Sequence, residues 1–263
     1  MAEIKDNNRV IFIISHKYYR GYESYLDYYI NNIKKNYENH LIVVVDNNSN
    51  YKEDVFSKIK NLNNVVLLEN NINSKFEIGA YTVGLDYLIG QNVLINYDYI
   101  VLTQDTFILK NKVDFNVLHD NNVKSCPINS YIPDGMFEYI SRDVLSSIGL
   151  YDNMDHITFC WCNSFIVSSD NAQKLYNYIK DINVTVRIES CASERYLARI
   201  IYELNDHKNY DIDGDIRYLG PEWDGVPNSG YKYDCHTVNP FDDNLKTHFV
   251  KRTQQKNENT LDL

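Results

Sequence analysis

Short apolar runs alternate with amphipathic stretches over the first 110 residues of the chain. Because these runs are continuous and rich in β-branched residues, they predict strands that are buried on both faces. Four strands are expected on this ground, at Val10–Ser15, Leu41–Val45, Val65–Leu68 and Tyr99–Thr103. Helical spacing of apolar residues predicts the intervening helices, at Tyr22–Ile33, Asp54–Ile59 and Gly79–Leu88. This order favours an α/β fold: a parallel sheet, extended into a mixed one, with helices on both faces.

The second half of the chain has a less regular pattern. Apolar stretches predict strands at Ser125–Ser130, Phe137–Ile140 and Ile157–Val167. Three helices are expected: Arg142–Ile148, one capped by Asp170 with Gln173 as capping box, and one through Leu197–Leu204 with Ser190 or Ser193 near its start. Residues 211–244 are predicted to be loop. Since no linker is evident, we expect one domain with halves 1–112 and 113–250 and a flexible tail, 251–263.

Composition and charge narrow the class of partner. The chain has 263 residues, 44% hydrophobic and 24% charged, and a net charge of -10. An acidic chain repels phosphate backbones, so a nucleic-acid partner is not expected, whereas a small anion held locally is compatible. No apolar run approaches the ~20 residues of a membrane span, and the polar start of the chain does not resemble a signal peptide. We therefore expect a cytoplasmic protein whose five scattered cysteines are buried thiols.

Polar residues follow each predicted parallel strand. The four segments are Ser15–His16, Asp46–Ser49, Glu69–Asn71 and Gln104–Thr106. In an open parallel sheet, ligands bind outside the carboxyl ends of the strands. Polar residues also simply end strands, but four of them at one edge predict a binding site.

Two carboxylates at this edge are candidates for ligand contacts. Asp105 stands between two apolar runs, where a carboxylate needs a partner, and a divalent metal ion would satisfy it. The alternative is a carboxylate that caps a turn. Asp46 could accept hydrogen bonds from a nucleobase or from hydroxyls, next to Asn47 and Asn48, which tolerate a left-handed turn. Its alternative is a plain Asx-turn.

Two helix starts carry further candidates. Glu77 opens a helix in which Gly79 and Ala80 could let an anionic ligand approach backbone N–H groups. The alternative is close packing of the helix on the sheet. Glu194 is expected in the first turn of its helix, where it could act as a general base or merely complement the helix dipole.

Several residues of the second half have chemistry suited to a site and also ordinary structural roles. His236 and His248 could each donate an imidazole to a metal. Trp161 has a ring suited to sugars, and Asn163 and His156 lie on or beside the same predicted strand. Core packing is the alternative for this group.

The order of these motifs resembles a known family. A strand ending in Asp46-Asn47-Asn48-Ser49 precedes Glu-Ile-Gly-Ala-Tyr-x-x-Gly-Leu at Glu77–Leu85 and Tyr-Asp-Tyr-Ile-Val-Leu-Thr-Gln-Asp-Thr at Tyr97–Thr106. This order is similar to the GT-A glycosyltransferases, most of all to the rhamnan-synthesis type. The resemblance covers residues 9–110, weakens at 160–169 and 190–204, and is absent beyond.

The resemblance implies roles for individual residues. Ser15, His16, Asp46 and Asn48 would lie by the nucleotide, and Glu77, Gly79, Ala80 and Gln104 by the diphosphate and sugar. Asp105 and His248 would hold Mn²⁺ or Mg²⁺, Glu194 would be the base, and Trp161 and Asn163 would contact the acceptor. One position departs from the family pattern: Thr103 stands where the first Asp of the metal motif belongs, which puts metal dependence in question.

The function expected from the sequence is transfer of a sugar from a nucleoside diphosphate sugar, UDP-sugars first, to a hydroxyl of a glycan or similar acceptor. If Glu194 is the base, the reaction inverts the anomeric centre. A glycosyltransferase-like protein that binds a glycan or partner without turnover is the alternative. A sugar-1-phosphate nucleotidyltransferase is less favoured, because residues 16–21 lack the Gly-rich basic signature of that class. A generic doubly wound binding protein is a third alternative.

Overall fold

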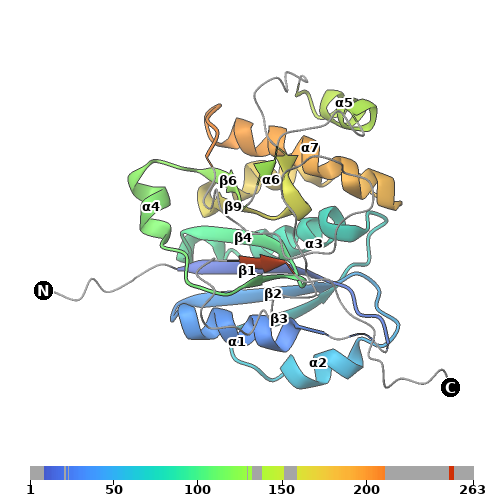
Figure 1. Cartoon of the computed structure of the whole chain (residues 1–263), viewed down its shortest axis with the longest axis vertical. Helices are drawn as coiled ribbons and strands as arrows, with labels where there is room; N and C mark the ends of the chain where they lie inside the picture. The colour runs from blue at the N-terminus through green and yellow to red at the C-terminus, as the bar shows by residue number, and fades with distance from the viewer. Residues whose placement is uncertain are drawn as a thin grey trace, which may run out of the picture.

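A six-stranded mixed sheet forms the centre of the molecule in the computed structural model, which describes residues 9–20, 22, 24–128, 130–131, 138–150, 159–210 and 249–251 (Figure 1). Its strand order is β3-β2-β1-β4-β9-β6. Four strands are parallel: β1 (Val10–His16), β2 (His40–Asp46), β3 (Val65–Glu69) and β4 (Tyr99–Gln104). Two are antiparallel to β4 or to each other: β9 (Phe165–Ser168) and β6 (Ser125–Pro127). The predicted α/β fold is confirmed, and both halves of the chain contribute to one sheet.

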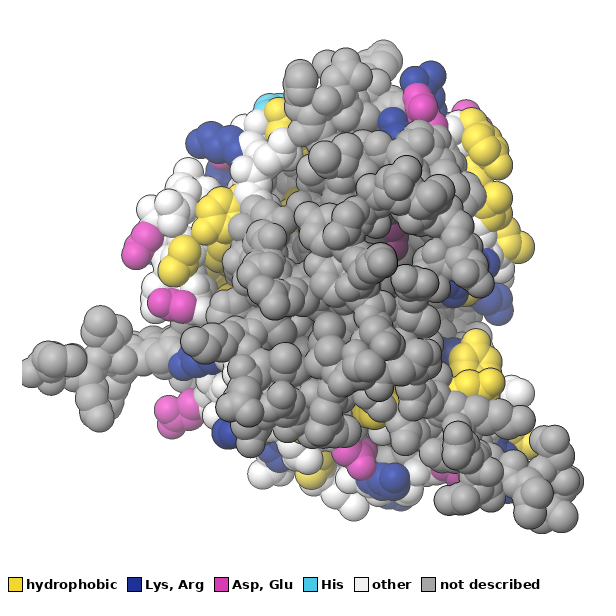
Figure 2. Space-filling view, in the orientation of Figure 1, with side chains coloured by type: hydrophobic (Ala, Val, Ile, Leu, Met, Phe, Trp, Pro, Cys, Tyr) yellow, Lys and Arg dark blue, Asp and Glu magenta, His cyan; other side chains and the backbone are white. Residues whose placement is uncertain are grey.

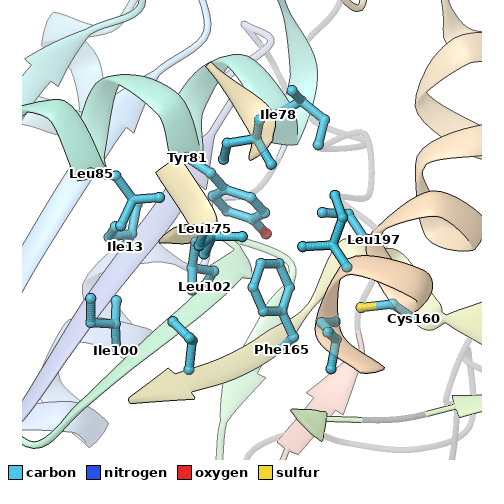
Figure 3. Packing of buried hydrophobic residues seen from close by; sticks show 14 of the residues in the cluster. Ile13, Ile78, Tyr81, Leu85, Ile100, Leu102, Cys160, Phe165, Leu175 and Leu197 are labelled. Carbon is cyan, nitrogen blue, oxygen red and sulfur yellow. The ribbon is translucent and has the colours of Figure 1, made fainter. Parts of the chain in front are cut away.

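Helices cover both faces of this sheet, as the alternating pattern predicted. One face packs against α1 (Leu26–Asn36) and α2 (Glu53–Ile59), in a core that contains Val10, Phe12 and Ile14. The opposite face, with Ile11 and Ile13, packs against α3 (Phe76–Gly90), α6 (Ala172–Ile179) and α7 (Arg187–Leu204). In this second core the rings of Tyr81 and Phe165 meet edge to face, with centroids 5.8 Å apart (Figure 3).

Shorter elements join and flank these layers. They are η1 (Leu94–Asn96), β5 (Phe107–Leu109), α4 (Phe115–Asp120), β7 (Ser130–Tyr131), α5 (Glu138–Ser147), β8 (Phe159–Cys160), η2 (Trp161–Asn163), η3 (Ser169–Asn171) and β10 (Phe249–Lys251). Strand β10 pairs antiparallel with β5, and β7 pairs antiparallel with β8. The ring of Phe249 in β10 stacks on that of Phe107 in β5 at 5.6 Å, which anchors the late strand to the first half of the chain.

The order in which successive strands are added to the sheet reverses at β1, although β1 and β4 are parallel. From β1 the chain moves through β2 to β3 on one side, and α3 then carries it back across the sheet to β4 on the other side of β1. Such a reversal leaves a crevice between the carboxyl ends of the two neighbouring strands, and ligands of open α/β sheets bind there. The polar segments 15–16 and 104–106 border this crevice.

Three expectations for the second half were wrong. Residues 138–140 are the first turn of α5 and not part of a strand, because they continue the helical face that buries Ser141 and Leu145. The stretch predicted as one strand through Val167 is interrupted at 161–163 by η2, where Cys162 has a φ of 52°. Helix α6 begins at Ala172 after η3, and no side-chain cap bond from Asp170 or Gln173 holds it.

Three of the four described cysteines are buried, as expected, whereas Cys235 lies outside the described residues. On the described part of the face shown in Figure 2, Lys and Arg side chains are interspersed with Asp and Glu. Within the described ranges no helix combines the length and apolar character that crossing a bilayer demands. The four described cysteines are free thiols: Cys126, Cys160 and Cys162 are buried, and Cys191 is half-buried.

Candidate functional site

A buried imidazole–carboxylate pair lies at the carboxyl ends of β1 and β4. His16, the last residue of β1, places Nδ1 2.6 Å from Oδ2 of Asp105, which directly follows β4. His16 is fully buried and Asp105 is 7% exposed. The backbone N–H of Lys17 donates to the same carboxylate oxygen at 3.3 Å. Two residues that are 89 positions apart in sequence therefore meet at the ends of two neighbouring strands.

This pair lies on the α1–α2 side of the sheet. The His16 ring stacks on Phe56 of α2, with centroids 5.9 Å apart. Its Nε2 is buried and has no hydrogen-bond partner. Buried polar atoms are nearly always bonded, so an orphaned imidazole nitrogen at this edge is compatible with a group that a ligand supplies.

Asp46, at the carboxyl end of β2, stabilises the turn that follows it. Its two carboxylate oxygens accept from the N–H of Ser49, at 2.8 Å, and from the Ser49 hydroxyl. Asn48 in this turn has a φ of 59°, the left-handed conformation anticipated for it. Both carboxylate oxygens of Asp46 thus make bonds of the Asx-turn kind, so the turn that was the alternative for Asp46 is present. A direct contact of Asp46 with a nucleoside stays a prediction.

Lys17 brings a positive charge to the turn after β2. Its Nζ donates to the backbone oxygens of Asn47 and Asn48, at 2.6 and 2.5 Å. Partial burial lowers the pKa of this ammonium, the nearby Asp46 carboxylate opposes that effect, and Lys75 adds to it. Sequence reasoning did not select Lys17, because a single lysine after a strand matches no motif.

Amide side chains link the ends of three strands. Asn47 Nδ2 donates to Ser15 Oγ at 2.8 Å, and Asn70 Nδ2 donates to Asn47 Oδ1 at 2.8 Å and to the backbone oxygen of Ser74 at 2.9 Å. The prediction that the polar segments after the parallel strands lie together is confirmed. They form a continuous edge of hydroxyl and amide groups beside the crevice.

On the α3 side, Glu77 is the centre of a second network. From the first turn of α3, its Oε1 accepts from Gln104 Nε2 at 2.8 Å. Its Oε2 accepts from Ser190 Oγ at 3.0 Å and from Asn163 Nδ2 at 3.3 Å. Glu77 therefore connects the β4 edge, in the first half of the chain, with η2 and α7 in the second half.

The η2 turn is strained and tightly held. Cys162 and Asn163 are consecutive non-glycine residues with a φ of 52° each. The turn is fixed by the Cys162 N–H donating to Glu194 Oε1 at 2.9 Å, by Ser193 Oγ donating to Asn163 Oδ1 at 2.8 Å, and by Tyr81 Oη donating to the Asn163 backbone oxygen at 2.8 Å. Left-handed residues cost free energy and persist where the surroundings hold them, often at functional sites. Ser190 and Ser193, expected only as helix caps, are part of this site.

Glu194 is not where the sequence placed it. Helix α7 begins at Arg187, so Glu194 lies two turns inside it, and the acidic residue of the first turn is Glu189. The helix dipole is therefore not the reason for this carboxylate. Burial is the main cause that raises the pKa of the half-buried Cys191 thiol; Arg187 opposes this effect, and the carboxylates of Glu194 and Glu77 add to it. Two carboxylates thus converge on this side of the sheet.

Gly79 and Ala80 pack against the protein itself. A Cβ on Gly79 would meet the backbone oxygen of Ser74 at 2.0 Å, and Ala80 is fully buried in the core below α3. The space beside Gly79 is filled by the 70–75 loop, which is the close-packing alternative. Direct contact of these two residues with a diphosphate stays a prediction.

The described residues do not assemble a metal site. Thr103, at the first position of the expected metal motif, is buried and its hydroxyl donates to the Phe107 backbone oxygen at 3.0 Å. Asp105 is bonded to His16. Across the described ranges, no group of three or more His, Cys, Asp or Glu side chains could hold a metal ion. The expected roles of His156, His236 and His248, and of the Trp161 side chain, lie outside what the structure describes.

A hollow of about 440 Å³ lies outside this edge, between the 72–74 loop, α3, α6 and the segment after α6. It is lined by, among others, Thr82, Asp86 and Tyr176, whose hydroxyl donates to Asp86 at 2.9 Å. None of the residues selected from the sequence lines it, so we do not assign it to the site.

Comparisons with known proteins place the chain in no family. No protein-family model matches it, and no curated protein matches it in sequence. Among solved structures it is similar to the 4-diphosphocytidyl-2C-methyl-D-erythritol synthase of Anaerococcus prevotii, with 13% identity and a TM-score of 0.44 over 78% of this chain and 85% of that one.

Proposed function

We propose that this protein is a glycosyltransferase that moves a sugar from a nucleoside diphosphate sugar to a hydroxyl of a glycan or similar acceptor. The observation that carries the proposal is the polar edge at the carboxyl ends of the parallel strands, where Glu77 joins Gln104 of β4 to Asn163 of η2 and Ser190 of α7. The first half would hold the nucleotide, and η2 with α7 would face the acceptor. The sequence resemblance to GT-A enzymes over residues 9–110 supports the same assignment.

The amide and hydroxyl edge suits the nucleoside of the donor. Ser15, Asn47 and Asn70 present hydrogen-bonding groups of both kinds along the ends of β1, β2 and β3. Such groups recognise the edge of a base and the hydroxyls of a ribose. UDP-sugars are the first donors to test, followed by GDP-, CMP- and dTDP-sugars.

Glu194 is the residue proposed as general base. Glu77 receives three hydrogen bonds that fix the architecture of the site. Glu194 is half-buried beside the η2 turn, and one of its oxygens accepts the Cys162 N–H. In the proposed step the acceptor oxygen forms a bond to the anomeric carbon as the bond from that carbon to the diphosphate breaks. The hydroxyl proton passes to Glu194, the nucleoside diphosphate leaves with the bonding electrons, and the anomeric centre inverts.

Two measurements test this function. Ligands that bind only the native state raise its melting temperature. We therefore expect one class among UDP-, GDP-, CMP- and dTDP-sugars to stabilise the protein, each being tried with and without Mn²⁺. With that donor and a panel of glycan acceptors, Glu194→Gln should lower kcat by about 10²–10⁴-fold without weakening donor binding. Glu203→Gln, in the last turn of the same helix and paired with Arg199, is the matched control.

A binding protein without turnover is the second candidate. It is favoured by the fact that Asp105 and Glu194 both make internal hydrogen bonds, to His16 and to the Cys162 N–H. In that case a glycan would bind, no acceptor would be glycosylated, and Asp105→Ala would leave glycan binding intact. If the protein transfers a sugar to any acceptor and Glu194→Gln abolishes that transfer, this second function is excluded. If no nucleotide sugar raises the melting temperature of the protein, the first function is excluded.

A further inference from the structure

The hollow between α3 and α6 is a cavity that the proposed reaction does not use. Its volume of about 440 Å³ lies within the range of ~300–1,000 Å³ that is usual for small-molecule sites. Its walls come from the two helices, from the 72–74 loop and from the segment 180–183 that follows α6. The chemistry of these walls indicates which class of ligand the hollow can bind.

The hollow is separate from the Glu77 network. Asp86 lies nine residues after Glu77 on α3, which is about two and a half turns of a helix with 3.6 residues per turn. The two carboxylates therefore lie on opposite sides of α3. Glu77 is bonded to Gln104 of β4, whereas Asp86 accepts a hydrogen bond from Tyr176 of α6. A ligand in the hollow would not contact the reacting groups.

Hydrogen bonds join the walls of the hollow. The N–H of Lys75 donates to the Val184 backbone oxygen at 2.6 Å, and the N–H of Val184 donates to Ser74 Oγ at 3.1 Å. On the other side, Tyr176 Oη donates to Asp86 Oδ1 at 2.9 Å and links α6 to α3. Because the walls are already joined, a ligand does not have to order them when it binds.

The lining combines polar groups with apolar surface. Amide groups come from Asn73 and Asn183, and apolar surface comes from Val83, Ile182 and the ring of Tyr176. Sugars have hydroxyl groups around the edge of the ring and C–H groups on its faces. Amides can both donate to and accept from hydroxyls, and apolar side chains pack against C–H faces. This combination therefore matches a carbohydrate.

The charges at the hollow favour a neutral ligand over an anionic one. Among the described residues that line it, Asp86 and Asp181 are negative and Lys180 is positive, and all three are exposed. The excess of negative charge repels a phosphate or a carboxylate ligand. An ionised carboxylate can instead accept hydrogen bonds from several hydroxyl groups at once.

A buried hydroxyl group in the wall lacks a partner. Thr82 of α3 is 6% exposed, and its Oγ1 makes no hydrogen bond within the described part of the chain. Buried polar groups are nearly always hydrogen-bonded, so this hydroxyl is an exception that calls for a partner. A hydroxyl of a bound sugar would supply it. This observation is independent of the shape and the charge of the hollow.

We infer that the hollow is a second carbohydrate-binding site, which holds a sugar unit of a neutral glycan acceptor away from the reacting hydroxyl. Asp86 and Thr82 would bond its hydroxyls, and the ring of Tyr176 would pack against a C–H face. The inference rests on the proposed function, which supplies the glycan acceptor. Attachment of one acceptor at two places raises the effective concentration of its reacting end at the site.

Binding is tested without nucleotide and in the presence of EDTA. The probes are neutral tetrasaccharides of glucose, mannose, galactose and N-acetylglucosamine, with tetragalacturonate as the anionic and tetraglucosamine as the cationic comparison. Titrations followed by saturation-transfer nuclear magnetic resonance give the affinities. We expect at least one neutral tetrasaccharide to bind, and neither charged one to bind more tightly.

Variants then locate the bound sugar. Asp86→Ala should weaken its binding by about 10- to 100-fold, the size of a lost hydrogen bond to a charged group, and Thr82→Val by about 3- to 10-fold. Thr82→Ser keeps the hydroxyl and should retain the affinity. Thr82→Val removes an unpaired buried hydroxyl, so its urea midpoint should not fall, which shows that the variant is folded. Asp54→Ala, exposed on α2 across the sheet, is the matched control.

The outcomes separate this inference from the proposed function. Failure of every neutral tetrasaccharide to bind, or binding that either Asp86→Ala or Thr82→Val leaves unchanged, would overturn the inference. Tighter binding of a charged tetrasaccharide than of every neutral one would also overturn it. None of these results changes the melting-temperature test with nucleotide sugars, which decides the proposed function by itself. A sugar that binds in the hollow of a protein that no nucleotide sugar stabilises would refute the proposed function and leave the carbohydrate site in place.

Discussion

Substitution of Gly79 by alanine distinguishes the two interpretations of the start of α3. If Gly79 leaves room for a diphosphate, the variant should fold normally and bind its ligand poorly. In the structure, however, the added Cβ would lie 2.0 Å from the Ser74 backbone oxygen and 2.5 Å from Asn70 Nδ2. An ordinary contact is about 3.5 Å, so the 70–75 loop would have to retreat by about 1.5 Å (3.5 − 2.0).

The cost follows from three contributions. Overpacking costs about 1–3 kcal/mol. The added Cβ also lies against both atoms of the Asn70–Ser74 hydrogen bond and would disrupt it, which costs about 1 kcal/mol. The higher helix propensity of alanine returns about 1 kcal/mol. We therefore expect Gly79→Ala to lower the free energy of unfolding by about 1–3 kcal/mol.

Gly90, at the other end of the same helix, is the matched control. A Cβ there meets no atom within 4 Å, so Gly90→Ala should stabilise the protein by up to about 1 kcal/mol through helix propensity. Urea unfolding followed by circular dichroism should separate the two variants by about 1–4 kcal/mol with equal m-values. In melting temperature the separation is roughly 2–15 °C. Equal stability of the two variants would refute the packing of the 70–75 loop on α3.

Two further predictions concern the site. Asp46→Ala should lower the free energy of unfolding by about 1–3 kcal/mol, because the N–H and hydroxyl of Ser49 lose their acceptors; urea denaturation measures this, and an unchanged midpoint would contradict the turn. The pKa of the Cys191 thiol is raised by burial and by nearby carboxylates, so its alkylation by iodoacetamide should rise with pH later than that of an ordinary thiol. Glu194→Gln removes one of those negative charges and should therefore lower this pKa and speed alkylation at fixed pH, measured peptide by peptide with mass spectrometry. An unchanged rate would contradict the proximity of Glu194 to Cys191.

The parallel strands were predictable because strands that are buried on both faces consist of continuous apolar runs. Strands β1 and β2 differ from the expected ranges by one residue at one or both ends. The place of the site was predictable for a related reason: a parallel sheet brings the carboxyl ends of its strands to one edge. What joins the residues at that edge was not predictable, since the bond of His16 to Asp105 depends on which strands are neighbours.

The errors fall where local pattern and tertiary context disagree. An apolar stretch that includes Cys162 has strand character, yet the contact of its N–H with Glu194 imposes a left-handed turn that a propensity argument does not contain. Helix α7 extends to Arg187 because Glu189 accepts the N–H groups of Thr185 and Val186, so the helix starts earlier than the serines suggested. Both corrections move Glu194 from a helix end to a position facing the η2 turn.

Because side chains alternate along a strand, residues of this site that are adjacent in sequence lie on opposite faces of the sheet. His16 follows Ser15, yet His16 stacks on Phe56 below one face of the sheet, whereas Ser15 belongs to the register of Ile11 and Ile13 on the other. By the same rule Asp105 and Gln104 separate: the first bonds to His16 and the second to Glu77.

Each face therefore has its own chemistry. The buried His16–Asp105 pair lies on the α1–α2 side of the sheet, and the Glu77 network on the α3 side offers groups suited to hydroxyls. Under the proposed function, the bond to be broken would lie at the carboxyl ends of the paired strands β1 and β4, where the strand order reverses.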